Sequence, residues 1–331
     1  LDRIRNRLPE SVESARLPVG IVIPVYNRAR RLPDTLSGVI TQARPPTRLV
    51  VVDDGSTDGS ADAAQQWLED AAPPFEWVVV RARHRHAAAA RNTGLERVQD
   101  LDYVTFLDSD DCWPDDFLAR ACALLEAATK AVAVSVDRAV DGPDSRHINP
   151  DLSGLPADPE LWMVKHDAGL ASCTLFSRQA VEAAGKWAEG MEAGEDFTLF
   201  SSVARLGTWL HATGKPVRFN RRVAGARGQQ GNLSRSLPTK HWNWADLAQR
   251  LLEETDDSDA ARKERLQQAV AQRWVSAGNH LLRKRFFGLA SKAYRRAMVL
   301  GQASPGVRAR AAVSGLLRPL GKRAPEYERA G

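Results

Sequence analysis

The 331-residue chain is 43% hydrophobic and carries a formal net charge of +5, so its apolar content suffices for one large domain or about two smaller ones. No run of about twenty apolar residues occurs, which argues against a transmembrane span, and the charged amino-terminal residues lack the apolar core of a secretory signal. The three cysteines have no paired spacing, which argues against a zinc site and favours a reducing, cytoplasmic location.

The first half of the chain alternates short β-rich runs with helical stretches. Continuous apolar runs predict strands buried on both faces, and apolar residues at helical spacing predict the helices between them. This alternation predicts an α/β fold with a mostly parallel sheet flanked by helices. The predicted strands are 19–24, 49–52, 75–80, 103–107 and 132–136, and the predicted helices are 30–42, 60–69, 87–98 and 115–128.

The second half has a less regular pattern. Residues 142–159 are rich in Gly, Pro, Asp and Ser and predict a long loop, whereas 171–177 predict a strand and 195–206 a helix. From residue 241 onward the pattern is helical, with interruptions at Pro305 and Pro319.

The end of the chain is strongly basic. Eleven Lys or Arg and no Asp or Glu lie between His280 and Arg323, so the rest of the chain is mildly acidic. Cations interleaved with apolar residues are typical of helices on an anionic membrane surface, so residues 280–323 are one candidate for peripheral membrane contact. A helical subdomain packed on the core with a solvated arginine-rich face is the alternative. We expect no nucleic-acid partner, because exposed aromatic platforms are not evident.

Polar residues directly follow three of the predicted strands. Tyr26 follows the first strand, Asp54 lies at the end of the second, and three acids, Asp108, Asp110 and Asp111, follow the fourth. Ligands of such sheets bind at the carboxyl ends of the strands, so we expect the site at this edge.

The three acids after the fourth strand favour a metal diphosphate. Carboxylates this close repel one another unless a cation lies among them. Mg²⁺ and Mn²⁺ prefer oxygen ligands and are commonly held by one or two carboxylates plus substrate phosphates. A solvated acidic turn is the alternative, although a buried strand before the acids would hold them rigidly.

Asp54 and Tyr26 have the chemistry of a nucleoside site. An acid in the turn at Gly55 can accept hydrogen bonds from a base or ribose, and a Tyr ring offers a face for stacking. An ordinary turn, with Asp58 capping the next helix, is the alternative.

These segments, in this order, resemble family 2 glycosyltransferases, whose fold is the nucleotide-sugar-binding glycosyltransferase A type. The matching pieces are IVIPVYNRARRL, VVVDDGSTDGS, AARNTGLE and YVTFLDSDD, followed by CTLFSRQAVEAAGK and GEDFTLFSSVARLG. The resemblance covers about residues 19–236. It implies an inverting enzyme that moves a sugar from a nucleotide-sugar donor, with UDP expected, to a hydroxyl of a glycan or lipid-linked glycan in bacterial-type surface polysaccharide or glycoconjugate synthesis.

The resemblance also implies domain bounds. We expect an extension over 1–18, a catalytic domain over 19–237 and a basic helical region over 238–331. Within the catalytic domain, 19–136 would bind the nucleotide-sugar and 137–237 the acceptor.

The resemblance assigns roles to individual residues. Pro24 and Tyr26 would line the nucleoside pocket, and Asp54 would recognise uracil. Asp108 and Asp110 would contact ribose and a Mn²⁺ or Mg²⁺ ion, with Asp111 assisting the metal.

Asp196 corresponds to the catalytic base that deprotonates the acceptor hydroxyl. Burial beside Glu195 would raise the pKa of this carboxyl group toward the operating pH. Two acids also favour a helix amino terminus through its dipole, and both explanations can hold together.

The chain departs from the family pattern in two places. Many relatives have a His near Arg227 and Gln229, either of which could replace it at the diphosphate. His86 lies where relatives often have Gly, and with His84 it forms either a metal pair or part of a solvated basic loop.

Two other functions are consistent with a sheet of this kind. A sugar nucleotidyltransferase usually has a Gly-rich loop after its first strand, but PVYNRARR contains no Gly. A non-catalytic carbohydrate-binding protein would be expected to lack the acids, which are present.

Overall fold

The computed structural model describes residues 17–128, 130–141, 151–166, 169–191, 193–220 and 240–322. Seven strands form one sheet in the order β3-β2-β1-β4-β6-β5-β7. All neighbouring pairs are parallel except the two made by β6, which is antiparallel to both β4 and β5. The strands are β1 (Val19–Val25), β2 (Arg48–Asp53), β3 (Glu76–Arg81), β4 (Tyr103–Phe106), β5 (Ala131–Asp141), β6 (Thr174–Ser177) and β7 (Thr208–Asn220).

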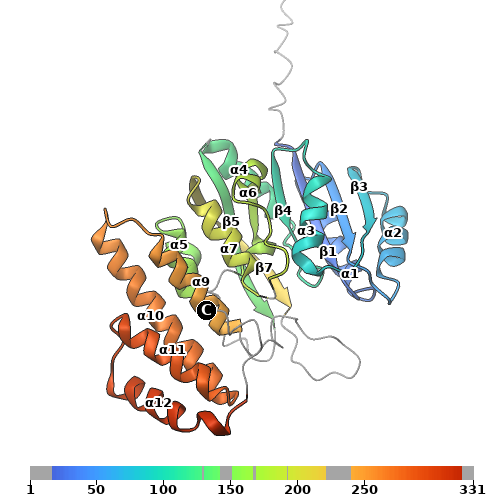
Figure 1. Cartoon of the computed structure of the whole chain (residues 1–331). Helices are drawn as coiled ribbons and strands as arrows, with labels where there is room; N and C mark the ends of the chain where they lie inside the picture. Colours follow the sequence, from blue (N-terminus) through green and yellow to red (C-terminus); the bar gives the residue numbers. More distant parts are fainter. Residues whose placement is uncertain are drawn as a thin grey trace, which may run out of the picture.

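Helices cover the sheet, as Figure 1 shows. Every residue of β1 is buried, which explains why its sequence is a continuous apolar run. The mostly parallel α/β sheet predicted from the sequence is thereby confirmed. The helices of this part are α1 (Leu32–Ile40), α2 (Ser60–Ala71), α3 (His86–Glu96), α4 (Phe117–Ala127), α5 (Pro159–His166), α6 (Arg178–Ala183) and α7 (Glu195–Ala204).

Several elements of the second half were not predicted from the sequence. They are β7, whose residues include exposed polar side chains, Gly214 and Pro216, and the short helices α5 and α6. The predicted strand 171–177 begins with a 3-10 turn at Ala171–Cys173. In the described part of the predicted loop 142–159, a 3-10 turn forms at Leu152–Gly154, where Leu152 and Leu155 are buried.

Four further helices follow residue 239 and gather away from β3 and α2 (Figure 1). A Cβ at Gly194 would lie 2.5 Å from Leu247 in the first of them, so this helix packs directly on the turn before α7. Among the described residues, no helix combines the length and apolar character that a membrane span requires. The helices are α9 (Lys240–Glu253), α10 (Ala260–Arg283), α11 (Phe287–Val299) and α12 (Pro305–Leu316).

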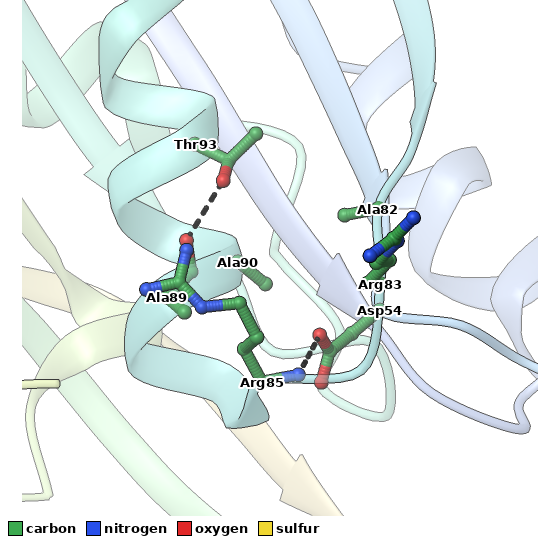
Figure 2. Close-up of a pocket in the computed structure, with 7 residues that line it drawn as sticks. All are labelled: Asp54, Ala82, Arg83, Arg85, Ala89, Ala90 and Thr93. Carbon is green, nitrogen blue, oxygen red and sulfur yellow. Dashed lines mark hydrogen bonds between the residues drawn. The ribbon is translucent and has the colours of Figure 1, made fainter. Parts of the chain in front are cut away.

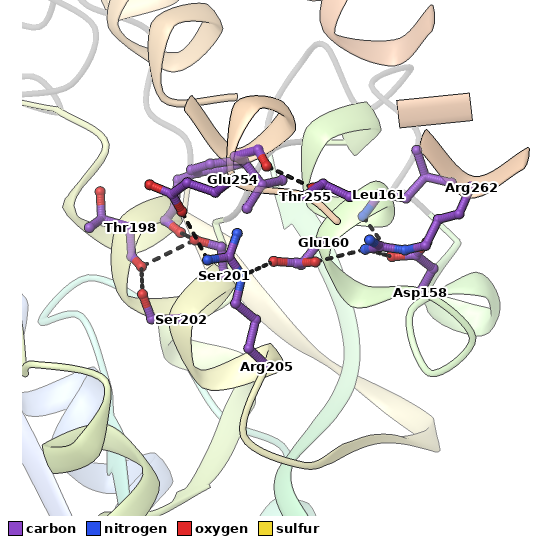
Figure 3. Close-up of polar contacts among 12 residues, drawn as sticks. Asp158, Glu160, Leu161, Thr198, Ser201, Ser202, Arg205, Glu254, Thr255 and Arg262 are labelled. Carbon is purple, nitrogen blue, oxygen red and sulfur yellow. Dashed lines mark hydrogen bonds and ion pairs between the residues drawn. The ribbon is translucent and has the colours of Figure 1, made fainter. Parts of the chain in front are cut away.

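Ion pairs join these helices to the sheet domain (Figure 3). Arg262 of α10 contacts Asp158 at 2.8 Å and Glu160 at 2.7 Å, both at the start of α5. Arg205, after α7, contacts Glu160 at 2.5 Å and Glu254 at 2.9 Å. Glu160 is buried, so two arginines from different parts of the chain compensate one desolvated carboxylate.

Candidate active site

The carboxyl ends of β1, β2 and β4 bring the predicted site segments together. The Asp54 amide donates to the carbonyl of Val25 at 2.8 Å, and the Leu107 amide donates to the carbonyl of Val22 at 3.0 Å. The segments after β2 and β4 therefore lie on either side of the same central strand, β1. Pro24 lies within that strand and is buried.

Asp54 lines a cavity of about 220 Å³ between β3 and α3 (Figure 2). Its carboxylate is buried and already has two partners. Oδ1 accepts from the backbone amide of Arg85 at 2.8 Å, and Oδ2 lies 2.8 Å from Nδ1 of His84. The other lining residues are Ala82, Arg83, Arg85, Ala89, Ala90 and Thr93.

His84 connects Asp54 to Tyr26. The rings of His84 and Tyr26 stack with centroids 4.2 Å apart, so the tyrosine face predicted to stack a base is covered by histidine. The ring of His86 lies 4.9 Å from that of His84. His86 has a φ of 71°, a left-handed conformation that favours glycine.

The acids after β4 lie in two different environments. Asp108 pairs with Arg91 at 2.6 Å, and Asp110 lies 3.5 Å from Arg28. Burial and the charge of Asp108 raise the pKa of Asp110. Asp111, in contrast, is only 4% exposed, and its carboxylate accepts from Ser172 Oγ at 2.6 Å.

Ser172 organises this acidic turn, a role that the sequence did not indicate. Its Oγ accepts from the Asp108 amide at 3.1 Å, and its carbonyl accepts from the indole of Trp113 at 2.6 Å. Asp111 and Asp108 are thereby fixed to the segment before β6.

Asp196 lies in the first turn of α7, as expected for an acid at a helix amino terminus. Its Oδ1 accepts from the amide of Phe197 at 2.7 Å. Burial, followed by the charge of Glu195, raises the pKa of Asp196 to about 7. A carboxyl group with this pKa can accept a proton near neutral pH.

Arg91 of α3 links the acidic turn to α7. Besides its contact with Asp108, its guanidinium lies 3.7 Å from Glu195. The sequence contained Arg91 within a matching segment but gave no reason to assign it a role.

Two predicted site residues, Arg227 and Gln229, lie outside the described residues. Within the described ranges, no group of three or more His, Cys, Asp or Glu side chains is arranged to hold a metal ion by itself. A metal pair of His84 and His86 would therefore have no third protein ligand in that part of the chain.

Comparison with solved structures identifies the fold. The chain superimposes on S. aureus TarS 1-349 in complex with UDP-GlcNAc with a TM-score of 0.61, at 16% identity, over 90% of this chain and 89% of TarS. It also superimposes on the mannosyltransferase PcManGT of Pyrobaculum calidifontis, in complex with GDP-Man and Mn²⁺, with a TM-score of 0.60, at 21% identity, over 92% and 81% of the two chains. The chain therefore has the glycosyltransferase A-type fold.

Sequence comparison then gives the family. Residues 20–184 match the model of glycosyl transferase family 2. TuaG of Bacillus subtilis, assigned to teichuronic acid biosynthesis, is 34% identical over 138 residues, which are 38% of this chain and 54% of TuaG. An undecaprenyl-phosphate 4-deoxy-4-formamido-L-arabinose transferase of Pseudomonas savastanoi is 37% identical over 111 residues, or 33% and 32% of the two chains.

The chain belongs to glycosyltransferase family 2, as the resemblance of its motifs implied. It spans about half or less of the length of these curated relatives.

Proposed function

We propose that the protein is an inverting, metal-dependent glycosyltransferase that moves a sugar from a UDP-sugar to an acceptor hydroxyl. The observation that carries this proposal is the placement of Asp196, whose pKa is raised to about 7, near the acidic turn after β4. The acids of that turn suit a divalent cation bound to a diphosphate. Arg91 spans the two groups, with contacts to Asp108 and Glu195. Base and donor acids thus belong to one connected site.

The cavity beside Asp54 is the proposed nucleoside site. Asp54 can accept a hydrogen bond from the N–H of uracil, provided that His84 gives up its contact with the same carboxylate. Movement of His84 would also uncover the Tyr26 ring for stacking. We therefore infer that the nucleoside displaces His84 from both Asp54 and Tyr26.

The acidic turn suits a divalent cation that the donor shares. Asp110, whose pKa is raised by burial and by Asp108, would be stabilised as a carboxylate by Mn²⁺ or Mg²⁺. One or two carboxylates plus diphosphate oxygens are an ordinary ligand set for these ions, and PcManGT was solved with Mn²⁺. When bound, the ion would neutralise the leaving diphosphate.

Asp108 and Asp110 are thus the proposed metal ligands, and Asp111 acts mainly through Ser172. Ser172 Oγ donates to the Asp111 carboxylate and accepts from the Asp108 amide, so Asp111 holds the serine that supports Asp108. Arg227 and Gln229 remain predicted contacts of the diphosphate.

Asp196 acts as the general base in this mechanism. It accepts the proton of the acceptor hydroxyl while the hydroxyl oxygen attacks the anomeric carbon. The bond from that carbon to the diphosphate oxygen breaks on the opposite face, which inverts the configuration. The proton then passes from Asp196 to solvent, and the nucleoside diphosphate leaves.

The proposed acceptor is a glycan or lipid-linked glycan of a bacterial-type surface polysaccharide. The names of TuaG and of the undecaprenyl-phosphate transferase support this class of acceptor. A location at the cytoplasmic face of a membrane would suit such an acceptor. We propose that α12 and residues 317–322 make that contact, because Leu316 is 81% and Leu320 69% exposed near Arg318 and Lys322.

Titration calorimetry with UDP, with and without Mn²⁺, tests the proposed function. We expect Mn²⁺ to tighten UDP binding by about tenfold or more, and Asp110→Ala to abolish that gain. Asp62→Ala is the matched control, because Asp62 is an exposed acid that pairs with Arg81 away from the site.

Absence of UDP binding in both metal states would contradict the proposed donor. Titration with GDP and dTDP would then distinguish a different nucleotide from a protein that has lost donor binding.

A further inference from the structure

We propose that Arg91 is a positioning residue that fixes the catalytic helix α7 relative to the donor-binding acid Asp108. This inference rests on the proposed function, because it assigns Arg91 a task in the same reaction. Neither the family match nor the sequence pattern assigns that task.

Arg91 is held at the meeting point of three segments. Its side chain is 7% exposed, and its guanidinium carbon lies 4.3 Å from the centre of the Trp187 ring. Trp187 is itself fixed, since its amide donates to Asn92 Oδ1 at 3.0 Å and its carbonyl accepts from Asn92 Nδ2 at 2.9 Å. The guanidinium thus lies on a rigid aromatic surface next to its own helix.

The two ends of the guanidinium group face different halves of the site. Nη2 contacts Asp108 at 2.6 Å, at the end of β4, while Nη1 lies 3.7 Å from Glu195, at the start of α7. A planar guanidinium fixes the angle between two such partners, which a lysine ammonium does not. The distance between the donor acids and Asp196 therefore depends on Arg91.

Arg91 also neutralises part of the negative charge of the acids around it. Asp108, Glu195 and Asp196 would repel one another in a partly desolvated site without a cation between them. Arg91 supplies that cation, and the same three acids all favour its charged form. Removal of the charge should therefore let α7 move away from the acidic turn.

Two nitrogens of the Arg91 guanidinium group can still form hydrogen bonds. Nε and Nη1 are buried and have no hydrogen-bond partner among the described residues. A small approach of α7 to α3 would bring Nη1 from 3.7 Å to hydrogen-bonding distance of Glu195 and strengthen the bridge.

Arg91→Met tests the bridge, because methionine keeps an unbranched side chain that fills part of the same space but removes both polar contacts. We expect the ratio of UDP Kd values without and with Mn²⁺ to fall toward one, and kcat to fall about 100-fold, as for a misplaced reacting group. Arg91→Lys should recover part of the Kd ratio but little of kcat, since one ammonium cannot hold both acids. Glu195→Gln should lower kcat and leave the Kd ratio unchanged.

Arg44→Met is the matched control. Arg44 is also mostly buried, at 16% exposure, and pairs with Glu126 at 2.7 Å away from the site. All measurements are made below the unfolding transition of each variant, so that loss of stability alone moves neither readout.

A folded Arg91→Met protein with the wild-type Kd ratio and kcat would overturn this inference and leave the proposed function intact. Full recovery of kcat in Arg91→Lys would also overturn it, because charge without geometry would then suffice. A wild-type protein that binds no UDP would overturn the proposed function and this inference together.

Discussion

At the residue scale, the environment that raises the pKa of Asp196 has two effects. It makes the carboxylate a better base, and it makes ionisation of this group unfavourable for the folded state. Its pKa of about 7 results from burial and from Glu195, and Arg91 and Lys240 only partly oppose the shift. Because only the carboxylate accepts a proton, we expect kcat/KM to rise with pH and to level off above about 7.

Asp196→Asn should remove the rising limb of this profile and lower kcat/KM by about 10²–10⁴-fold. Measurement of kcat/KM from pH 5 to 9 checks both effects. An unchanged pH profile in Asp196→Asn would assign the proton transfer to another group.

The same substitution should stabilise the protein at high pH. The native pKa of Asp196 lies above the ordinary value of 3.8, so ionisation destabilises the folded state progressively as the pH rises from about 4 to 7. Asparagine carries no such charge. We expect Asp196→Asn to have a higher Tm than the wild type at pH 8 and a similar Tm at pH 4, measured by calorimetry. A lower Tm at pH 8 would contradict the raised pKa.

Residues that directly follow a strand could be located from the sequence, because the carboxyl ends of parallel strands lie at one edge of the sheet. Asp54, Asp108 and Asp110 directly follow strands, so their place at the sheet edge could be predicted. Ser172 and Arg91 could not be assigned in this way, because their roles depend on contacts between segments far apart in the chain.

At the scale of elements, strands made of a continuous apolar run were predictable, including the half-buried edge strand β3. β7 was not predictable, because four consecutive exposed residues, 213–216, interrupt it where its register with β5 shifts between Val136 and Arg138. Such irregularity breaks the period of two that identifies a strand in sequence.

Ion pairs between α5 and α10 attach the helices beyond residue 239 to the sheet domain. Arg262→Met removes one of two cations that compensate the buried Glu160, while Arg205 remains. We expect a loss of about 1–3 kcal/mol in the free energy of unfolding, below the cost of leaving a buried charge unpaired. Arg250→Met is the control, because Arg250 forms an exposed pair with Asp246 in one helix and should cost about 0.5 kcal/mol or less.

Denaturant unfolding of both variants measures the difference. Equal losses in Arg262→Met and Arg250→Met would mean that the helices beyond residue 239 do not depend on this ion pair for their attachment.

At the scale of the whole molecule, the basic segment divides into packed and exposed side chains. Leu281 and Tyr294 are fully buried within the helices, which agrees with a packed helical subdomain. Leu316 and Leu320 are exposed instead, near Arg318 and Lys322. The packed helical subdomain therefore describes the buried face of this region, and the proposed membrane contact concerns the exposed face.

The exposed face is placed suitably for an enzyme that uses a membrane-linked acceptor. In Figure 1 the strands carrying the site end toward the lower part of the picture, where α12 also lies, on the outer side of α11. A membrane against α12 would thus lie on the same side of the molecule as the carboxyl edge of the sheet.

Vesicle sedimentation tests this orientation. The intact chain should sediment with phosphatidylglycerol-containing vesicles at low salt and much less with neutral ones, because each cation near an anionic surface contributes about 1 kcal/mol. Leu316→Glu with Leu320→Glu should abolish sedimentation, since it removes apolar contact and adds like charge. Leu206→Glu, at a leucine 47% exposed after α7, should leave it unchanged. If the intact protein stays in the supernatant at low salt, membrane contact through α12 is excluded, and an acceptor in solution becomes the consistent substrate.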